Sequence, residues 1–428
     1  MTETEIVMLP LRPECRYALA AAGRCGAVAI AQAGAEPPPG RTALEACFAP
    51  MPPDSSWGLA VPAATAGEWL AAEGVPARIP VVVICEEAAE PAAVAGAVGL
   101  ARPRAGRVLV ECHVPENGPA YLAAGAEGLV LKAGEAGGFN AELSSFVLAQ
   151  MAPRFRAPVW IEGAWSPETA AAARAAGCGI CLREELWLAR EMAMPDTLRS
   201  LFMQADGTET SCLHDRSNRH YRTWIPRILP SAAALADTVS RGTELRVAVP
   251  GFQPLALASL YPFEVGQGMG LAASLARQGA SLAGILEGFR GAAARLPALA
   301  ARQRILAPGH GVAASLGTAL PIVQGPMTRV SDCPEFARAV SEAGALSCLA
   351  LGVLTPARIR ELFARTREAV GGQPWAAGIL GFLPPALYRE QAGCVCEAQP
   401  RAVILAGGRP DQAAAFEGAG IKAFLHAP

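Results

Sequence analysis

Short apolar runs alternate with alanine-rich segments along most of the chain. The runs include "IPVVVICEE", "GRVLVECHVP", "AEGLVLKAG" and "APVWIEGAW", and "SPETAAAARAAG" is an example of the segments between them. A run that is apolar at consecutive positions is typical of a parallel strand covered by helices. About eight such strand–helix units fall within residues 1–195, which favours a compact (β/α)8 barrel over an open sheet.

This alternation stops between residues 196 and 308. The stretch "DGTETSCLHDRSNRHYRTW" is polar and typical of a loop. Further on, "ASLARQGASLAGILEGFRGAAARLPALAARQRIL" predicts two helices with a break near Pro297, because proline interrupts the helical hydrogen bonds. We therefore expect residues 196–308 to form a linker of helices and loops.

The strand–helix pattern then returns as a repeat of the beginning of the chain. "LPIVQGPMTRVSDCPEFARAV" parallels "EIVMLPLRPECRYALAAAG", and His426-Ala427-Pro428 falls opposite His113-Val114-Pro115. Residues 309–428 are thus expected to hold the opening four strands of a second, similar barrel that is truncated. The alternative is that any two stretches of strands and helices look alike.

An incomplete barrel has an open sheet edge, which natural proteins usually protect with charges or proline. The run "RAVILAGG" carries neither within its apolar positions. We therefore expect Val403, Ile404 and Leu405 to face water or another chain.

Composition and charge exclude several classes of protein. Apolar residues make up 52% of the 428 residues and charged residues 17%, so a large core can form. A net charge of −2 argues against nucleic acid or an anionic membrane as the main partner. The acidic N-terminus lacks a signal pattern and no apolar run is long enough to span a membrane, so we expect a cytoplasmic protein.

The cysteines do not predict a metal site. Cys178 and Cys181 have C-x-x-C spacing, but Cys394 and Cys396 do not complete a set of four zinc ligands. Among the histidines, His214 and His220 stand near Asp215 and Arg216. That group is either an acid–base cluster or a solvated loop.

The most specific motif ends the first strand of the repeat: Gln324, Gly325, Pro326 and Met327. Glycine permits close approach of the backbone, and proline fixes the turn. The motif resembles the nitronate monooxygenase (2-nitropropane dioxygenase) family, in which this loop lies against the flavin of FMN. The likeness is strongest to the enoyl reductase and nitronate monooxygenase-like domains of polyunsaturated fatty acid and polyketide synthases.

The resemblance extends, in eroded form, to residues 1–195. Gly134, Glu135, Gly137 and Gly138 match the family pattern Gly-x-Glu-Ala-Gly-Gly-His, whose histidine is the catalytic acid and base. Phe139 occupies the histidine position here, and phenylalanine cannot transfer a proton. The resemblance therefore implies a rim loop suited to a ligand but leaves the catalytic residue unknown.

A second difference concerns the phosphate of FMN, which the family binds at the loops after strands 7 and 8. Gly163 stands in the first of these loops, but Glu162 before it would repel a phosphate. Arg183 in the second loop would partly compensate. Two interpretations stay open: the glycines shape tight turns, or they retain flavin binding. For Gln324–Met327 the corresponding alternatives are packing and contact with FMN.

The resemblance implies an FMN-dependent oxidoreductase-like protein that is part of a polyketide or fatty acid synthase. Its two possible reactions are oxidation of a nitronate and reduction of an enoyl group by NAD(P)H, with an acyl carrier protein as partner. The alternative is a non-catalytic barrel scaffold that docks domains of such a synthase. Phe139 and Glu162 favour this alternative for the first barrel.

Overall fold

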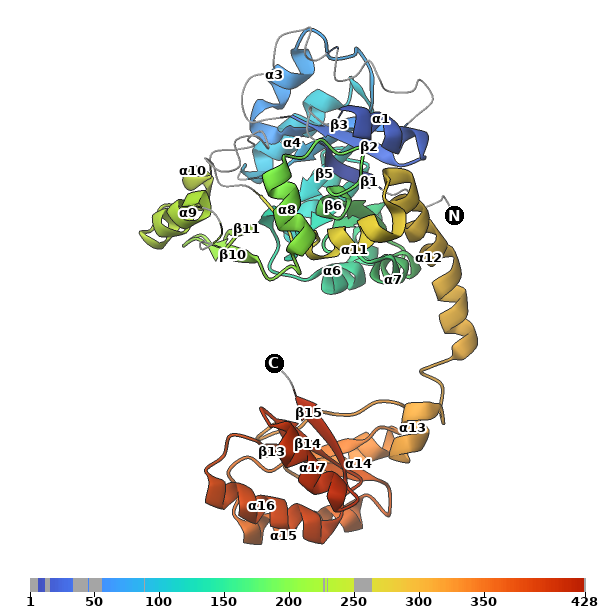
Figure 1. The fold of residues 1–428 in the computed structure, drawn as a ribbon, viewed down its shortest axis with the longest axis vertical. Helices are drawn as coiled ribbons and strands as arrows, with labels where there is room; N and C mark the ends of the chain where they lie inside the picture. Colours follow the sequence, from blue (N-terminus) through green and yellow to red (C-terminus); the bar gives the residue numbers. More distant parts are fainter. Residues whose placement is uncertain are drawn as a thin grey trace. The chain divides into compact units, whose positions relative to one another are not determined.

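The structure, a computed structural model, describes residues 7–11, 16–33, 45, 56–87, 89–225, 228, 230–249 and 264–426. The chain divides into two compact units, Met1–Ala298 and Leu299–Pro428 (Figure 1).

Eight parallel strands of the first unit close into a barrel in the order β1-β2-β3-β4-β5-β6-β8-β9, which confirms the predicted fold. Pairing of β1 with β9, through Val7 with Cys181 and Met8 with Leu182, completes the ring. The strands are β1 (Val7–Leu11), β2 (Val28–Gln32), β3 (Trp57–Pro62), β4 (Ile79–Cys85), β5 (Ala105–Cys112), β6 (Gly128–Lys132), β8 (Val159–Glu162) and β9 (Gly179–Leu182).

The strands are apolar at consecutive positions because both of their faces are buried. On β4, Val81 and Val83 belong to the cluster inside the barrel, whereas Val82 and Ile84 pack toward the helices. Helices follow most strands and cover the outer face (Figure 1). They are α1 (Arg16–Arg24), α3 (Ala66–Ala71), α4 (Pro91–Ala101), α5 (Gly118–Ala123), α6 (Ser145–Met151) and α7 (Pro167–Ala175), with the short 3-10 turns η2 (Ala63–Thr65), η3 (Pro115–Asn117), η4 (Ala152–Phe155) and η5 (Glu184–Leu186).

A small antiparallel sheet lies beside the barrel (Figure 1). Its strands are β7 (Gly138–Asn140), β10 (Thr210–His214) and β11 (His220–Trp224), in the order β10-β11-β7. The strand β7 follows the glycine-rich loop after β6, so this loop joins the barrel to the small sheet. The remaining helices of the unit are α8 (Asp196–Gln204), α9 (Pro230–Ser240), α10 (Leu245–Ala248), α11 (Met269–Gly279) and the first part of α12 (Leu282–Gln303).

The segment expected to be a linker belongs largely to the first unit. Met269 of α11 and Leu282, Leu286 and Phe289 of α12 are buried in the same apolar cluster as the barrel strands. The division between the two units falls between Ala298 and Leu299, whereas the sequence placed boundaries at 195 and 308. The helix break is also misplaced: it falls at Ala280 and Ser281, and Pro297 lies inside α12. Sequence periodicity does not reveal which core a helix joins.

The second unit contains a parallel sheet in the order β12-β13-β14-β15. Its strands are β12 (Ser347–Ala350), β13 (Trp375–Leu380), β14 (Ala402–Ala406) and β15 (Lys422–His426). Its helices are α13 (Gly311–Leu316), α14 (Pro334–Glu342), α15 (Pro356–Ala369), α16 (Pro385–Ala398) and α17 (Pro410–Gly418). Proline stands at the first position of the last four helices, where it has no hydrogen bond to lose.

The edges of this sheet differ from the expectation. Val403 and Leu405 of β14 are fully buried, because β15 pairs with β14 and helices cover the sheet. The exposed strand is β15, where Phe424 and Leu425 are 40% and 39% exposed. At the other side, Val323 forms only an isolated bridge to Leu346.

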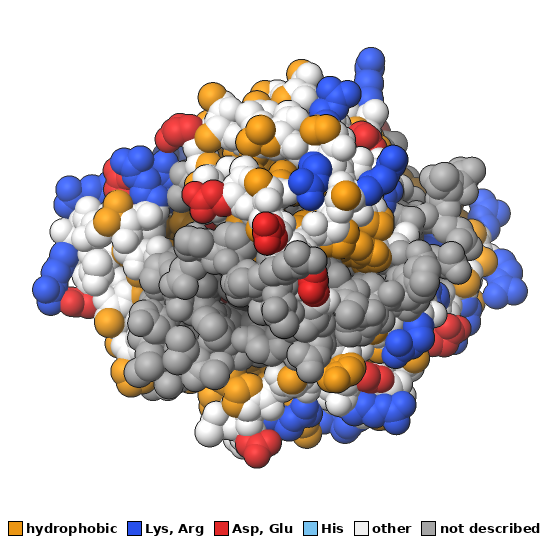
Figure 2. Space-filling model, turned by 90° about the horizontal axis from the view of Figure 1, so that it is seen from above, with side chains coloured by type: hydrophobic (Ala, Val, Ile, Leu, Met, Phe, Trp, Pro, Cys, Tyr) orange, Lys and Arg blue, Asp and Glu red, His pale blue; other side chains and the backbone are white. Residues whose placement is uncertain are grey.

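The surface of the described residues carries charges of both signs, as the small net charge of −2 leads one to expect. On the face drawn in Figure 2, basic and acidic side chains are interspersed with apolar ones. None of the helices within the described residues has both the length and the apolar character needed to cross a bilayer.

The placement of α12 can be tested by truncating Phe289, which is 1% exposed. We expect Phe289→Ala to lower the free energy of unfolding by about 3–5 kcal/mol, because it leaves a cavity in the barrel unit. Urea denaturation monitored by circular dichroism measures the loss. Glu287→Ala, at an exposed position of the same helix, is the matched control. An equal, small effect of both changes would show that the helix is a linker.

Candidate functional site

Charged side chains form the last layer inside the barrel. Leu109, Val130, Trp160 and Cys181 belong to the interior cluster. The residue two positions later on each strand shares the same face, because side chains alternate along a strand. These residues are Glu111, Lys132, Glu162 and Arg183, all under 10% exposed. They meet at the C-terminal mouth, where the active sites of such barrels lie.

Arg183 is the centre of this layer. Its Nε lies 2.9 Å from Glu162 Oε1, and its Nη1 lies 2.8 Å from Oε1 of Glu264, which precedes α11. Lys132 Nζ is 3.4 Å from Glu111 Oε1 and 3.8 Å from Glu162 Oε1. Cations and carboxylates of the chain itself thus fill the mouth.

Burial controls the protonation of these groups. Desolvation raises the pKa of Glu162, and the positive charges of Arg183 and Lys132 oppose the rise. Desolvation would lower the pKa of Lys132, but Glu111 and Glu162 outweigh it and raise that pKa. Both cations therefore stay charged and need their carboxylate partners.

The family resemblance places the phosphate of FMN at the loops after the seventh and eighth strands. In this chain a carboxyl group already accepts hydrogen bonds from a backbone amide of each of these loops. Glu185, fully buried in η5, accepts hydrogen bonds from the amides of Trp165 and Arg183 at 2.9 and 3.0 Å. Trp165 follows β8 and Arg183 follows β9, the seventh and eighth strands of the barrel. Glu184 accepts a further bond from the amide of Gly266 at 2.8 Å.

The glycines of the sequence motif contact the chain itself. A Cβ on Gly137 would lie 2.8 Å from Gly266 N, and one on Gly138, whose φ is +74°, would lie 2.4 Å from Glu264 Oε2. Gly134 accepts a hydrogen bond from Arg222 Nε at 2.7 Å through its carbonyl. Because these glycines have no side chain, the segment before α11 and the strand β11 can pack directly against the loop.

The other motif residues of the first barrel also have structural partners. The carboxylate of Glu135 accepts a hydrogen bond from the amide of Ser145 at 3.0 Å. A Cβ on Gly163 would meet Ser145 Cβ at 3.0 Å, so Gly163 allows α6 to pack closely. Phe139 is 9% exposed and packs edge-to-face on Tyr221, with 5.2 Å between ring centroids.

These observations test whether FMN fits the first barrel. The two rim amides are occupied by Glu185, the glycine loop is covered by the segment from Glu264 to Gly268, and the mouth holds Arg183 and its partners. A phosphate would have to displace a buried carboxyl group in a place lined by further acids. The residues present therefore do not fit the group.

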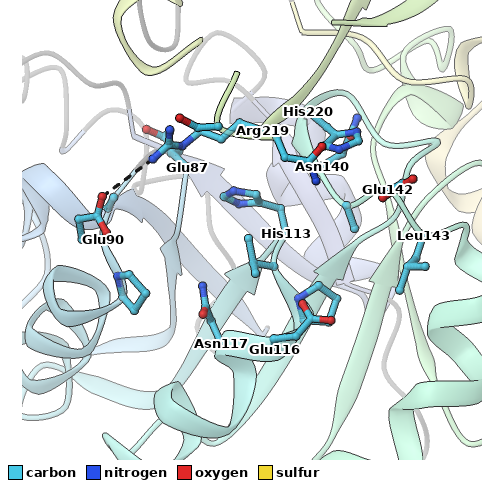
Figure 3. A pocket seen from close by; sticks show the side chains of 17 residues that line it. Glu87, Glu90, His113, Glu116, Asn117, Asn140, Glu142, Leu143, Arg219 and His220 are labelled. Carbon is cyan, nitrogen blue, oxygen red and sulfur yellow. Dashed lines mark ion pairs between the residues drawn. The ribbon is translucent and has the colours of Figure 1, made fainter. Parts of the chain in front are cut away.

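A cavity of about 540 Å³ lies at the same rim, beside the charged layer (Figure 3). It is lined by residues that follow β4 and β5, by Asn140 of β7 and by the turn between β10 and β11. His113 lies in the middle of the labelled side chains. Arg219 reaches across to Glu90, with 3.9 Å between Nη2 and Oε1.

His113 is oriented by a buried carboxylate. Its Nδ1 lies 2.9 Å from Glu86 Oε2, and Glu86 also accepts hydrogen bonds from Asn117 Nδ2 at 2.8 Å and from the hydroxyl of Tyr121. Burial opposes ionisation of Glu86, but these hydrogen bonds outweigh it and lower its pKa to about 2. Such a pair leaves the second imidazole nitrogen for proton transfer.

Sequence reasoning missed both the His113–Glu86 pair and the role of Glu185. His113 stood out only as the counterpart of His426 in the repeat, although its place at a strand end was a usable signal. Glu184 and Glu185 have the sequence character of a surface turn. Both carboxyl groups are buried, and the segment around Gly266 packs beside them, with its amide donating to Glu184. The sequence does not show this contact between distant segments.

The motif of the second unit lies in a loop. Gln324 accepts a hydrogen bond from the amide of Cys348 at 2.9 Å through Oε1. Pro326 packs against Gly378 of β13, where a Cβ would lie 2.2 Å from Pro326 Cβ. Gly325 and Met327 are exposed. The loop thus packs against strands β12 and β13 of the sheet. Its proposed contact with FMN stays a prediction.

No protein-family model matches the chain, and neither does any curated protein sequence. Solved structures do match. FabK from Thermotoga maritima aligns with a TM-score of 0.52 and 17% identity, over 69% of this chain and 96% of that chain. A point variant of the same FabK gives a TM-score of 0.50 at the same identity and coverage. Nitroalkane oxidase from Streptomyces ansochromogenes aligns at 0.46 and 18% identity, over 68% of this chain and 97% of that one.

These comparisons concern the fold. The alignment with FabK, at 17% identity, supports a shared architecture and no more. The barrel that the family resemblance implied is thereby confirmed, while the chemistry has to be argued from the residues present.

The charged layer can be tested through Arg183, whose side chain is 1% exposed. We expect Arg183→Met to lower the free energy of unfolding by about 3–5 kcal/mol, because Glu162 and Glu264 lose their partner inside the barrel. Urea denaturation measures the change. Arg190→Met is the control, since Arg190 is 76% exposed and its pair with Glu191 is stretched to 3.6 Å. A loss for Arg183→Met as small as for the control would contradict the assignment.

A second test uses pH. Burial, reinforced by Glu184, raises the pKa of Glu185 from 4.5 to about 8. Between these values the folded protein keeps a proton that the unfolded chain releases, so this group makes the free energy of unfolding fall as pH rises. Glu185→Gln removes the titration but keeps an amide-accepting oxygen. We expect the variant to gain stability relative to the parent from about pH 5 to about pH 8 in urea denaturation. A difference that does not vary with pH would contradict the shift.

Proposed function

We propose that the first unit is a barrel of the FMN-oxidoreductase type that does not hold flavin and serves as a non-catalytic scaffold within a polyketide or fatty acid synthase. The observation that carries this proposal is the carboxyl group of Glu185 on the amides of Trp165 and Arg183. Fixed backbone amides are the usual cradle for a phosphate, and here both amides already donate hydrogen bonds to Glu185.

Electrostatics in the mouth support the same proposal. Arg183, whose amide belongs to that cradle, interacts with the carboxyl groups of Glu162, Glu184 and Glu264. Arg183 is already paired with two of these carboxylates, at 2.9 and 2.8 Å. A dianionic phosphate would add negative charge to a buried site in which the guanidinium of Arg183 already pairs with two carboxylates.

The catalytic position supports it as well. Phe139 provides no transferable proton, and its side chain packs on Tyr221 outside the barrel. Reduction of an enoyl group or oxidation of a nitronate needs a proton donor or acceptor beside the reacting carbon. His113 lies next to Phe139, with 5.7 Å between ring centroids, but it faces a cavity with no flavin cradle.

For the second unit we propose the FMN role that the sequence resemblance implies. Gln324, Gly325, Pro326 and Met327 would border the flavin, with NAD(P)H as reductant and an acyl carrier protein as partner. Gln324 is held in place by the amide of Cys348, and Gly325 is exposed with open space beside its Cα. A backbone that is both fixed and accessible suits contact with a planar ring.

Flavin titration tests the proposal. We expect any FMN that the 428-residue chain binds, measured by quenching of FMN fluorescence at micromolar concentration, to be held by the second unit alone and none by the first barrel. The physical reason is that Glu185 and Arg183 occupy the place of the phosphate. Any FMN binding is to be measured again in Gln324→Ala and in Glu185→Ala.

If FMN binds, the two variants show which unit holds it. Binding that Gln324→Ala removes belongs to the second unit and agrees with its proposed role. Binding that persists in Gln324→Ala and changes in Glu185→Ala would place FMN in the first barrel and overturn its assignment as a scaffold. Turnover of an enoyl thioester or a nitronate by the Gln324→Ala variant would do the same.

A further inference from the structure

Three side chains of metal-binding types gather on one face of the hairpin formed by β10 and β11. Cys212 and His214 are two positions apart on β10, so their side chains share a face. His220 is paired directly with His214 across the hairpin and therefore lies on that face too. One ligand atom from each of the three residues lies within 4.8 Å of the others.

His220 gives an independent reason to expect a ligand here. The residue is 7% exposed, and its Nε2 is buried without a hydrogen-bond partner among the described residues. A buried polar atom left unsatisfied costs about 1–3 kcal/mol. The contact with His214, with 4.3 Å between ring centroids and 75° between planes, packs the rings but does not satisfy this nitrogen.

We propose that Cys212, His214 and His220 bind a zinc ion, or another divalent ion that prefers sulfur and nitrogen, through one sulfur and two imidazoles. Zinc–sulfur and zinc–nitrogen bonds of about 2.3 and 2.0 Å place ligand atoms about 3.5 Å apart in a tetrahedron. The cluster must therefore contract by about 1 Å. His214 is exposed, so its ring can turn without disturbing the core.

The surroundings fit such an ion. Cys212 Sγ donates only weak hydrogen bonds, to Asn140 Oδ1 at 3.6 Å and to the carbonyl of Leu213 at 3.8 Å. Metal binding releases this thiol proton to solvent, and Asn140 can then turn its amide. Burial raises the pKa of the Cys212 thiol, and the charge of Arg222, which pairs with Cys212 across the hairpin, opposes that rise.

Three protein ligands leave one position of the tetrahedron open. His220 also lines the cavity of Figure 3, together with Asn140 and His113. Water from this cavity can complete the coordination. This departs from the sequence-based prediction of no metal, which rested on the lack of a set of four zinc ligands around the C-x-x-C pair, and it does not depend on the proposed role of the barrel.

Cobalt(II) is the probe, since a tetrahedral cobalt site with a thiolate ligand has a near-ultraviolet charge-transfer band and visible d–d bands. The 428-residue chain is stripped with EDTA, dialysed and titrated with cobalt(II) under reducing conditions. We expect both bands to saturate at one ion per chain and to disappear when zinc is added. Failure of both bands to develop would overturn the proposal.

The variants Cys212→Ser, His214→Gln and His220→Ala identify the ligands. We expect each to weaken binding by roughly a hundredfold or more, since even the loss of a group that only orients a ligand costs 10–100-fold. Cys25→Ser, which changes a residue that follows α1, and His310→Ala, which changes a residue of the second unit, should bind as the parent does. His214→Gln changes an exposed residue, so it keeps the test valid if the buried changes disturb folding, which circular dichroism reports. Unchanged bands in Cys212→Ser or His214→Gln would overturn the proposal.

Discussion

The pairing of Arg183 with Glu162 and Glu264 is the interaction on which the first unit depends. A guanidinium inside a closed barrel has lost its water, and it is tolerated only with carboxylates in contact. Glu162 comes from the neighbouring strand, but Glu264 comes from a segment more than eighty positions along the chain, so the pairing at 2.8 Å draws that segment onto the mouth. Helix α11 and the first part of α12, which follow this segment, therefore pack on the barrel.

The same segment explains the glycine-rich loop. Gly137 and Gly138 leave room for Glu264 and Gly266, and Gly266 donates its amide to Glu184. Glu185 in turn takes the amides of Trp165 and Arg183. Features that would serve an anionic ligand in a related barrel are here satisfied within one chain, because the amides of Trp165, Arg183 and Gly266 each donate to a carboxyl group.

The barrel could be predicted from sequence because burial on both faces leaves its mark on consecutive residues, as in "IPVVVICEE". The polar layer at the mouth was partly visible, since Glu162 and Arg183 follow strands at the expected position. The remainder depends on contacts between distant segments. Nothing local to Phe289 shows that it joins the barrel core, and nothing local to Glu185 shows that it is fully buried. The face shared by Cys212, His214 and His220 required the register of the hairpin.

The first barrel differs from a flavin site by more than one residue, and the geometry shows why. Phe139 lies on β7, where it is paired with Tyr221 of β11 and buried with Leu235 and Leu245. A histidine at this position would enter an apolar cluster and lose hydrogen bonds to water, which lowers its use as an acid or base. Its surroundings would still contain Arg183 and Glu185 in place of a phosphate. The phenylalanine at position 139, the charged layer in the mouth and the carboxyl group on the rim amides are thus separate features, and each contributes to a well-packed barrel.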